Sequence, residues 1–383
     1  MKKYVFIVLI LSLAHAGYAQ TTNDILNVLV QRKLVAQDEA DSLRADAAIK
    51  QQDSDAKKKS FLVTAGRNIQ LSSYTQVRYQ NLEESGKKSG FDIRRARLDI
   101  KGTISPIFSY RLQPEFAGSS ARLLDAFAEI KLSDYFNLTI GQQKVSLSLE
   151  SQAADNKYDF IDRAVVVESL VGRSKDVIGG PSPTTVNNNG RDLGIQINGS
   201  FLKINDHSII DYWVGLFNGA GINVAENNNT KDLAGRLVLH PISGLDLGGS
   251  VYNGVGNYKP DTISTHKVAD FTRKRWGVEL KYELKNFLFQ AEFLKGKDGV
   301  KTEQGYYLEG AYFILPQKLQ FLAKIDSYNP NKLKKSVEQY TYFAGINYSF
   351  NPNARLQIGY DVKQQKATTI HKNYAVAQFL IGF

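Results

Sequence analysis

A short charged stretch carries the side chains best suited to bind a solute. Phe91–Ile104 reads FDIRRARLDIKGTI, and its alternate positions carry Arg95, Arg97, Asp99 and Lys101. A β-strand directs successive side chains to opposite faces, so these charges share one face and apolar residues share the other. A row of charges is costly in a dry core. It is typical of the inner wall of a water-filled barrel whose outer wall meets lipid.

Further basic residues extend this candidate anion-binding wall. Arg111 lies on the next predicted strand and Lys131 on the one after it, and both are assigned to the pore lining. Arg94 breaks the alternation and is expected at the rim or on a bulge. Acidic residues are interspersed, so two interpretations stay open, an anion filter and a structural ion-pair network that holds barrel and loop. The nearby acids are Asp99, Glu115, Asp125 and Glu129.

The longest connection between predicted strands, Leu147–Arg191, is a candidate constriction. Its apolar segments Ala164–Val167 and Leu170-Val171 are unusual for a loop in water. Folding inward against a barrel wall would bury them. The narrowest point of the channel would then be lined by Arg163, Arg173, Lys175 and Arg191. The alternative is an external loop packed against neighbouring loops or a neighbouring subunit.

Composition narrows the possible functions. The chain has 383 residues, a formal charge of +10 and no cysteine, so disulfides, thiol catalysis and thiolate metal sites are excluded. Negative mean hydropathy argues against a helical membrane protein but not against a membrane barrel. The histidines outside the first segment are scattered and no serine motif accompanies them, which predicts no enzyme, no metal site and no cofactor. Net charge alone suggests nucleic-acid binding, and the alternating strands outweigh it.

The first sixty residues differ from the rest in the spacing of their apolar and polar side chains. Residues 1–19 combine Lys2-Lys3, an apolar run and a small-residue site, which predicts a secretory signal peptide. Residues 20–60 show apolar residues at helical spacing and then a polar linker. We expect a small periplasmic helical hairpin here, or a short coiled coil that helps three copies to assemble.

Residues 61–383 alternate apolar and polar side chains almost throughout and predict a membrane barrel. We count sixteen antiparallel strands, with boundaries good to about three residues. An even number lets the sheet close and abolishes its edges. Connections alternate between short turns and long loops such as Asn253–Thr272 and Lys295–Gln304. This parity predicts an outer-membrane barrel with turns and both termini in the periplasm.

Aromatic residues and the final strand add to the barrel prediction. Aromatics near strand ends predict girdles at the two lipid interfaces. They are Phe287, Phe293, Tyr306, Tyr312, Tyr342, Tyr348, Phe350 and Tyr374. Phe379, Ile381 and Phe383 share one face of the final strand. They resemble the signal by which barrel-assembly machinery recognises outer-membrane proteins.

Several motifs resemble the phosphate-selective porin O and P family. They are FDIRRARLDIKG, LLDAFAEI, LTIGQQKVSLSLE, GRDLGIQING and WVGLFNGAG, within Phe91–Gly221. The resemblance implies a sixteen-stranded homotrimer with periplasmic N-termini and an inward-folded third loop rich in arginine. Family members that select phosphate use arginines in the constriction and lysines lower in the channel. Arg163, Arg173 and Lys175 are counterparts by region.

The expected protein is therefore a porin in the lipid of a Gram-negative outer membrane. It would pass small hydrophilic solutes, with a preference for anions such as phosphate. The alternative is a non-conducting envelope barrel that acts as an adhesin or tether. Single-channel conductance distinguishes the two, because a closed barrel gives no current steps.

Overall fold

The computed structural model describes residues 30–32, 36, 62–64, 67–83, 89–172, 190–204, 207–258, 269–334, 337–366 and 373–383. The chain divides into two units, residues 1–60 and 61–383. The predicted signal peptide lies outside the described residues, as do the predicted N-terminal helices apart from 30–32 and 36. Among the described residues, no helix is long and apolar enough to span a membrane.

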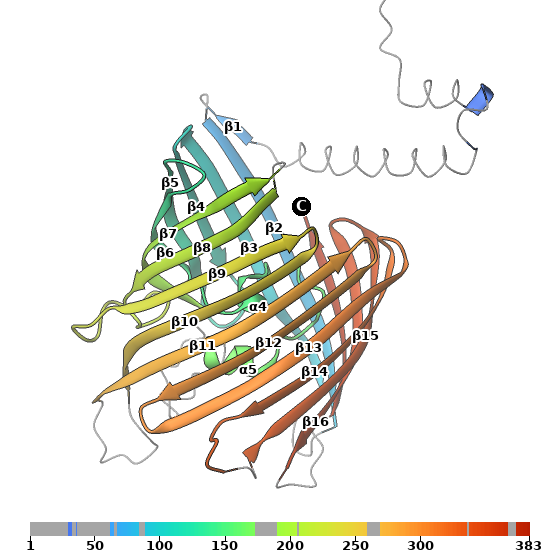
Figure 1. The fold of residues 1–383 in the computed structure, drawn as a ribbon. Helices are drawn as coiled ribbons and strands as arrows, with labels where there is room; N and C mark the ends of the chain where they lie inside the picture. The colour runs from blue at the N-terminus through green and yellow to red at the C-terminus, as the bar shows by residue number, and fades with distance from the viewer. Residues whose placement is uncertain are drawn as a thin grey trace, which may run out of the picture. The chain divides into compact units, whose positions relative to one another are not determined.

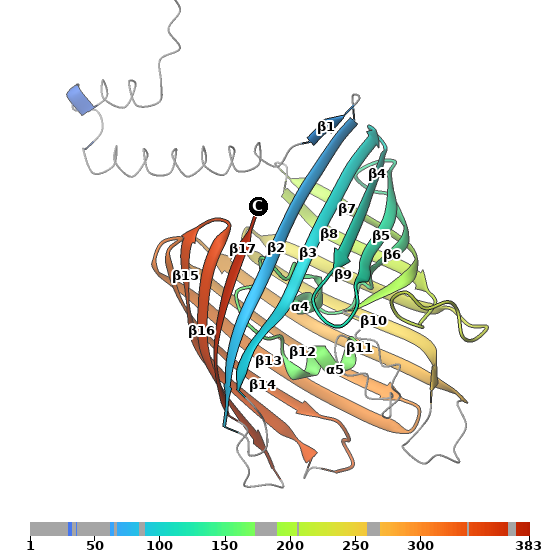
Figure 2. The same ribbon diagram turned by 180° about the vertical axis from the view of Figure 1, so that it is seen from behind.

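The second unit is a closed antiparallel β-barrel (Figures 1 and 2). Within the described residues, sixteen strands, β2 to β17, pair in sequence order, and β17 pairs with β2 to close the sheet. The short strand β1, Leu62–Thr64, pairs with the start of β2. The predicted sixteen-stranded antiparallel barrel is therefore confirmed. The strands are β2 Arg67–Leu82, β3 Gly90–Ser105, β4 Phe108–Glu115, β5 Arg122–Lys131, β6 Asn137–Lys144, β7 Arg191–Ile204, β8 His207–Phe217, β9 Asp232–Ile242, β10 Leu245–Tyr258, β11 Ala269–Leu284, β12 Phe287–Asp298, β13 Lys301–Leu315, β14 Leu319–Asn329, β15 Gln339–Asn351, β16 Ala354–Gln365 and β17 Tyr374–Gly382.

The barrel is apolar outside and polar inside. On β14, Lys324 is 4% exposed and faces the lumen, whereas its neighbours Phe321 and Ile325 are 46% and 42% exposed on the outside. Apolar side chains gain nothing from facing water, so this inverted arrangement belongs in lipid. The final strand follows the same rule, since Phe379 and Ile381 also face outward and are exposed.

A bulge reorients the charged start of β3. Arg95 pairs with Gln76 and Ile93 pairs with Val77, so Arg94 has no cross-strand partner. Both Arg94 and Arg95 consequently reach loop residues inside the barrel. The expectation that Arg94 leaves the alternation on a bulge is confirmed.

Two expectations about the strands are wrong. Lys295–Gln304 is not a long loop, because β12 and β13 run through it and leave only Gly299 and Val300 between them. Glycine and lysine are typical of loops, yet here their alternation continues that of the strand. The loop ends of β10 to β13 accordingly extend four to six residues beyond the predicted limits. Tyr374 is also not a girdle residue, since it is buried and bonds Asp162 in the lumen.

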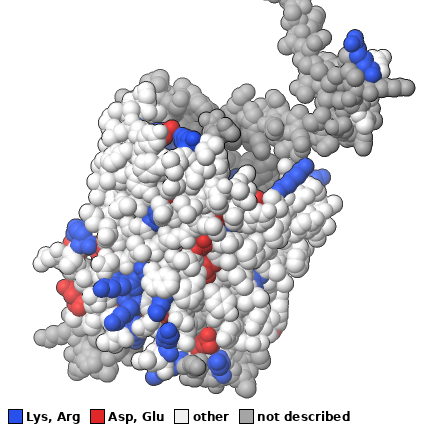
Figure 3. Space-filling model, in the orientation of Figure 1, with Lys and Arg blue, Asp and Glu red and all other residues white. Residues whose placement is uncertain are grey.

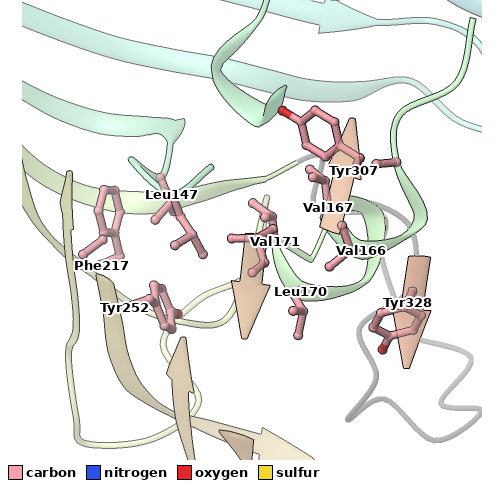
Figure 4. Packing of buried hydrophobic residues seen from close by; sticks show 13 residues of the cluster. Leu147, Val166, Val167, Leu170, Val171, Phe217, Tyr252, Tyr307 and Tyr328 are labelled. Atoms are coloured by element: carbon pink, nitrogen blue, oxygen red, sulfur yellow. The ribbon is translucent and has the colours of Figure 1, made fainter. Parts of the chain in front are cut away.

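The main apolar cluster lies inside the barrel, between the connection after β6 and the wall (Figure 4). This connection contains the short helices α4, Leu149–Gln152, and α5, Val165–Leu170. Val166, Val167 and Leu170 pack against wall residues that include Tyr307 and Tyr328. The prediction that this loop folds inward is confirmed for residues 145–172, which we call the inner loop.

Candidate functional site

Wall carboxylates hold the backbone of the inner loop. Asp326 accepts a hydrogen bond of 2.5 Å from the N–H of Val165, at the start of α5. Glu292 accepts from Ser148 Oγ at 2.9 Å and from the N–H of Leu149 at 3.3 Å. The first N–H groups of a helix have no partner within it, and acidic groups there also suit the helix dipole. Strands β12 and β14 thus supply the groups that both helices need at their starts.

A glycine lets α5 lie directly on the wall. Gly305 faces Val166, and a Cβ atom built at Gly305 would lie 2.8 Å from the Val166 Cβ and 2.2 Å from the Ser327 carbonyl oxygen. Any side chain here would push the helix or the strand away. Gly296 opposes Leu170 in the same manner. These inward-facing glycines therefore allow the inner loop to pack closely against the barrel wall.

Asp155 of the inner loop is the centre of a buried ion-pair cluster. Arg97 on β3 reaches Asp155 at 2.5 Å and Glu115 on β4 at 2.6 Å, and its side chain is 3% exposed. Arg163 from the loop itself reaches Asp155 at 2.7 Å, and Arg95 does so at 3.4 Å. Buried charges persist only where they are paired and hydrogen-bonded. The cluster therefore attaches the loop to β3.

Two further acids attach the loop elsewhere on the wall. Asp159 bonds Arg355 on β16 at 3.0 Å and Gln320 on β14 at 2.9 Å. Asp162 pairs with Arg94 and accepts a hydrogen bond from Tyr374 on β17 at 2.7 Å.

The ion pairs of Asp162 with the wall lower the pKa of its carboxyl group. Burial alone would raise the pKa of its carboxyl, but Arg94 and Arg78 outweigh burial and hold the pKa below its ordinary value. Asp162 is consequently ionised at neutral pH and binds the wall as a charged group.

The structure brings together only some of the predicted site residues. Arg95, Arg97 and Arg163 meet at Asp155, whereas Arg191 pairs with Asp125 on β5 at 2.5 Å. Arg111 lies between Asp99, at 2.7 Å, and Asp125, at 3.1 Å. Lys131 lies at the turn end of β5 and pairs with Asp134. Arg173 and Lys175 lie outside the described residues.

A cavity of about 440 Å³ lies in the lumen on the turn side of β2 to β5. Lys101 and Arg111 line it together with Glu129, Ser109 and Tyr110. The Lys101 side chain is 51% exposed and forms a 3.6 Å ion pair with Asp99. Among the described residues, Lys101 is thus a cation that a solute can reach, on the wall below the inner loop.

Sequence reasoning missed the acids of the inner loop. Asp155, Asp159 and Asp162 lie three or four residues apart in a segment whose apolar content predicts burial. Each buried carboxylate requires a cationic or hydrogen-bonding partner. That requirement, combined with an arginine-rich wall, was the available signal.

A closed barrel with an apolar exterior, a polar lumen and a long loop folded inside is the architecture of an outer-membrane porin. Comparison with known proteins gives the same class. The chain belongs to the family "Phosphate-selective porin O and P", whose model matches residues 63–254. Members of this family are channels and not enzymes, and this chain is accordingly an outer-membrane barrel of the porin type.

Solved porin structures share the fold at low sequence identity. The outer membrane channel DcaP of Acinetobacter baumannii is 13% identical with a TM-score of 0.60, over 85% of this chain and 99% of that one. OmpF of Salmonella typhi is 12% identical with a TM-score of 0.61, over 84% and 100%. OmpT of Vibrio cholerae in a trimer form is 13% identical with a TM-score of 0.57, over 83% and 100%. A search of curated proteins found no match.

Proposed function

We propose that the protein is a porin that lets small hydrophilic solutes diffuse through the outer membrane, with a modest preference for small anions such as phosphate. The observation that carries this proposal is the lumen cavity lined by Lys101 and Arg111. Its lining holds these two cations and one acid, Glu129, and the Lys101 side chain is 51% exposed although Asp99 pairs with both cations. A cationic wall raises the local concentration of anions.

Charge compensation keeps the proposed preference small. Arg95, Arg97, Arg163 and Arg191 are paired with carboxylates and buried or nearly so. We therefore propose that they shape the pore by holding the inner loop, and that Lys101 and Arg111 meet the solute. Roles for Arg173 and Lys175 stay predictions from the sequence.

We further propose that the protein is a homotrimer in a Gram-negative envelope, with turns and both termini in the periplasm. Strands β4 to β6 are 8, 10 and 8 residues long and are among the shortest of the barrel. Leu112 and Ile140 on its outer face are exposed and apolar, as an interface between copies requires. OmpT of Vibrio cholerae, which has the same fold, is described in a trimer form.

The termini complete this proposal. Residues 1–19 would be the signal peptide, residues 20–60 a periplasmic helical segment, and residues 61–383 the barrel. Phe379, Ile381 and Phe383 would be read by the assembly machinery before insertion into outer-membrane lipid.

The test is planar-bilayer conductance of the purified full-length protein. We expect current steps, a reversal potential in a KCl gradient on the anion side, and a reduced chloride current when phosphate is added. Lys101→Gln should shift the reversal potential toward cations, whereas Lys318→Gln, on the exposed turn between β13 and β14, should leave it unchanged. An unchanged reversal potential in Lys101→Gln would contradict the assignment.

A non-conducting adhesin or tether is the second candidate. One observation favours it, namely that the inner loop bonds both to β3 and to β12, which lie nearly opposite each other in the closed sheet. Absence of current steps from correctly folded protein would support this alternative and exclude the porin.

A further inference from the structure

Three lysines face outward from the barrel wall near the loop ends of β11 and β12. Lys274 on β11 is two residues from the exposed Trp276, and strand alternation puts both on the outer face. Lys297 is the direct cross-strand partner of Lys274, and Lys295 is the partner of Trp276. We call Lys274, Lys295 and Lys297 the lysine patch. The space-filling view shows basic side chains gathered on this side of the molecule (Figure 3).

The lysine patch is not paired with any acid of the described residues. No described carboxylate forms an ion pair with any of the three lysines, and the nearby Asp298 instead pairs with Arg275 inside the barrel. Like charges directly opposite each other on neighbouring strands destabilise the sheet. The patch is thus arranged for an external anion.

The depth of the patch identifies the kind of anion. Trp276 contacts Phe293 with ring centroids 5.5 Å apart, and Phe293 pairs with Tyr306 on β13. Outward aromatics of this kind mark the lipid–water interface. Lys274 and Lys297 lie two residues further along their strands than Trp276 and Lys295, which is roughly 7 Å toward the loop ends. That is the level of lipid headgroups.

We propose that the lysine patch binds the phosphate groups of a phosphorylated glycolipid in the outer leaflet of the outer membrane. Lysines near an anionic membrane surface are attracted to it, and ammonium groups form charge-assisted hydrogen bonds with phosphate oxygens. The patch lies in sheet order well away from β4 to β6, the proposed contact between copies, so lipid reaches it in a trimer as well. The inference rests on the proposed orientation of the loop ends toward the outside. It does not depend on what passes the channel.

The experiment measures lipid retention by full-length protein in detergent, read by native mass spectrometry. The probes are bisphosphorylated lipid A, the same lipid with its phosphates removed, and inorganic phosphate as a competitor. The variant is the triple substitution Lys274→Gln, Lys295→Gln and Lys297→Gln. The matched control is Lys285→Gln, an exposed lysine at the opposite end of the same hairpin. Heat-modifiable mobility on gels verifies that each barrel is folded.

We expect the native protein and Lys285→Gln to retain bisphosphorylated lipid A and to lose it only weakly to excess inorganic phosphate. The triple variant should bind at least tenfold more weakly, and the dephosphorylated lipid should not be retained. Equal retention by the triple variant, or equal retention of the dephosphorylated lipid, would overturn the proposal. Displacement by equimolar inorganic phosphate would also overturn it, since the site would then be for free anions. Because retention is measured without current, it stays informative even if the channel proves closed.

Discussion

The contact between Arg97 and Asp155 decides whether the wall arginines filter anions or hold the inner loop. We consider the single substitutions Arg97→Gln and Asp155→Asn and their combination. The two side chains are 3% and 2% exposed, so a passing solute does not reach them in this conformation. Removing one partner of a buried pair generally costs about 3–5 kcal/mol. Arg97 keeps Glu115 and Arg163 keeps backbone carbonyls, so we expect the lower end of this range.

The assay is single-channel conductance, combined with thermal unfolding of the barrel. If the arginines hold the loop, each single variant loosens it, and conductance and current noise both rise. The double variant should then be no worse than the worse single variant, because the two substitutions remove the same contact. If the arginines instead filter anions, Arg97→Gln should reduce anion current, Asp155→Asn should increase it, and the two effects should add.

The control pair is Arg111→Gln with Asp99→Asn. These side chains bond each other at 2.7 Å on the wall, are 26% and 12% exposed, and lie outside the loop cluster around Asp155. They should leave current noise unchanged. Additive and opposite effects at Arg97 and Asp155 would refute the view that these residues attach the loop.

Two further predictions concern the contacts that hold the inner loop against the barrel wall. Gly305→Ala should displace α5 and raise conductance at a cost of about 1–3 kcal/mol, whereas Gly310→Ala on the same strand, where the nearest atom is 3.8 Å from the added Cβ, should not. Because the pKa of Asp162 is lowered in the folded protein, its stabilising contribution is complete above the ordinary carboxyl value of about 4 and declines below it. The contribution of Asp162 to holding the loop should therefore stay constant from pH 7 to about pH 4, and its loss in more acid solution should raise conductance. Asp162→Asn should show a raised conductance with a smaller acid-dependent rise, and an unchanged acid response would contradict this account.

Much of the barrel could be predicted because strand alternation is local. The inward row Arg95, Arg97, Asp99 and Lys101 is visible in a single stretch of sequence, and the same period recurs to the end of the chain. The inward position of the loop was predictable for a similar reason, since Val166, Val167 and Leu170 cannot remain in water. Strand ends at Lys295–Gln304 were not, because lysine and glycine are common in turns and only the pairing partner reveals that the ladder continues.

Whether each arginine is exposed to the lumen or paired with an acid could not be predicted, because its partner lies far away in the chain. Arg97 meets Asp155 across 58 residues, and Arg355 meets Asp159 across 196. A row of arginines on a strand looks the same in sequence whether it faces water or an acidic loop. Only the folded position of the inner loop separates these cases.

The formal charge of the chain is consequently a poor guide to the selectivity of its pore. Arg97, Arg163 and Arg191 are neutralised by buried carboxylates, and the lysine patch faces lipid rather than the lumen. What remains for a solute is the Lys101 ammonium group, whose side chain is half-exposed in the lumen. If this division of charge is right, Lys101→Gln changes anion preference and leaves lipid A binding intact, while substitution of the lysine patch does the reverse. Two variants that each remove positive charge from one barrel would then have separable effects, which neither net charge nor strand pattern predicts.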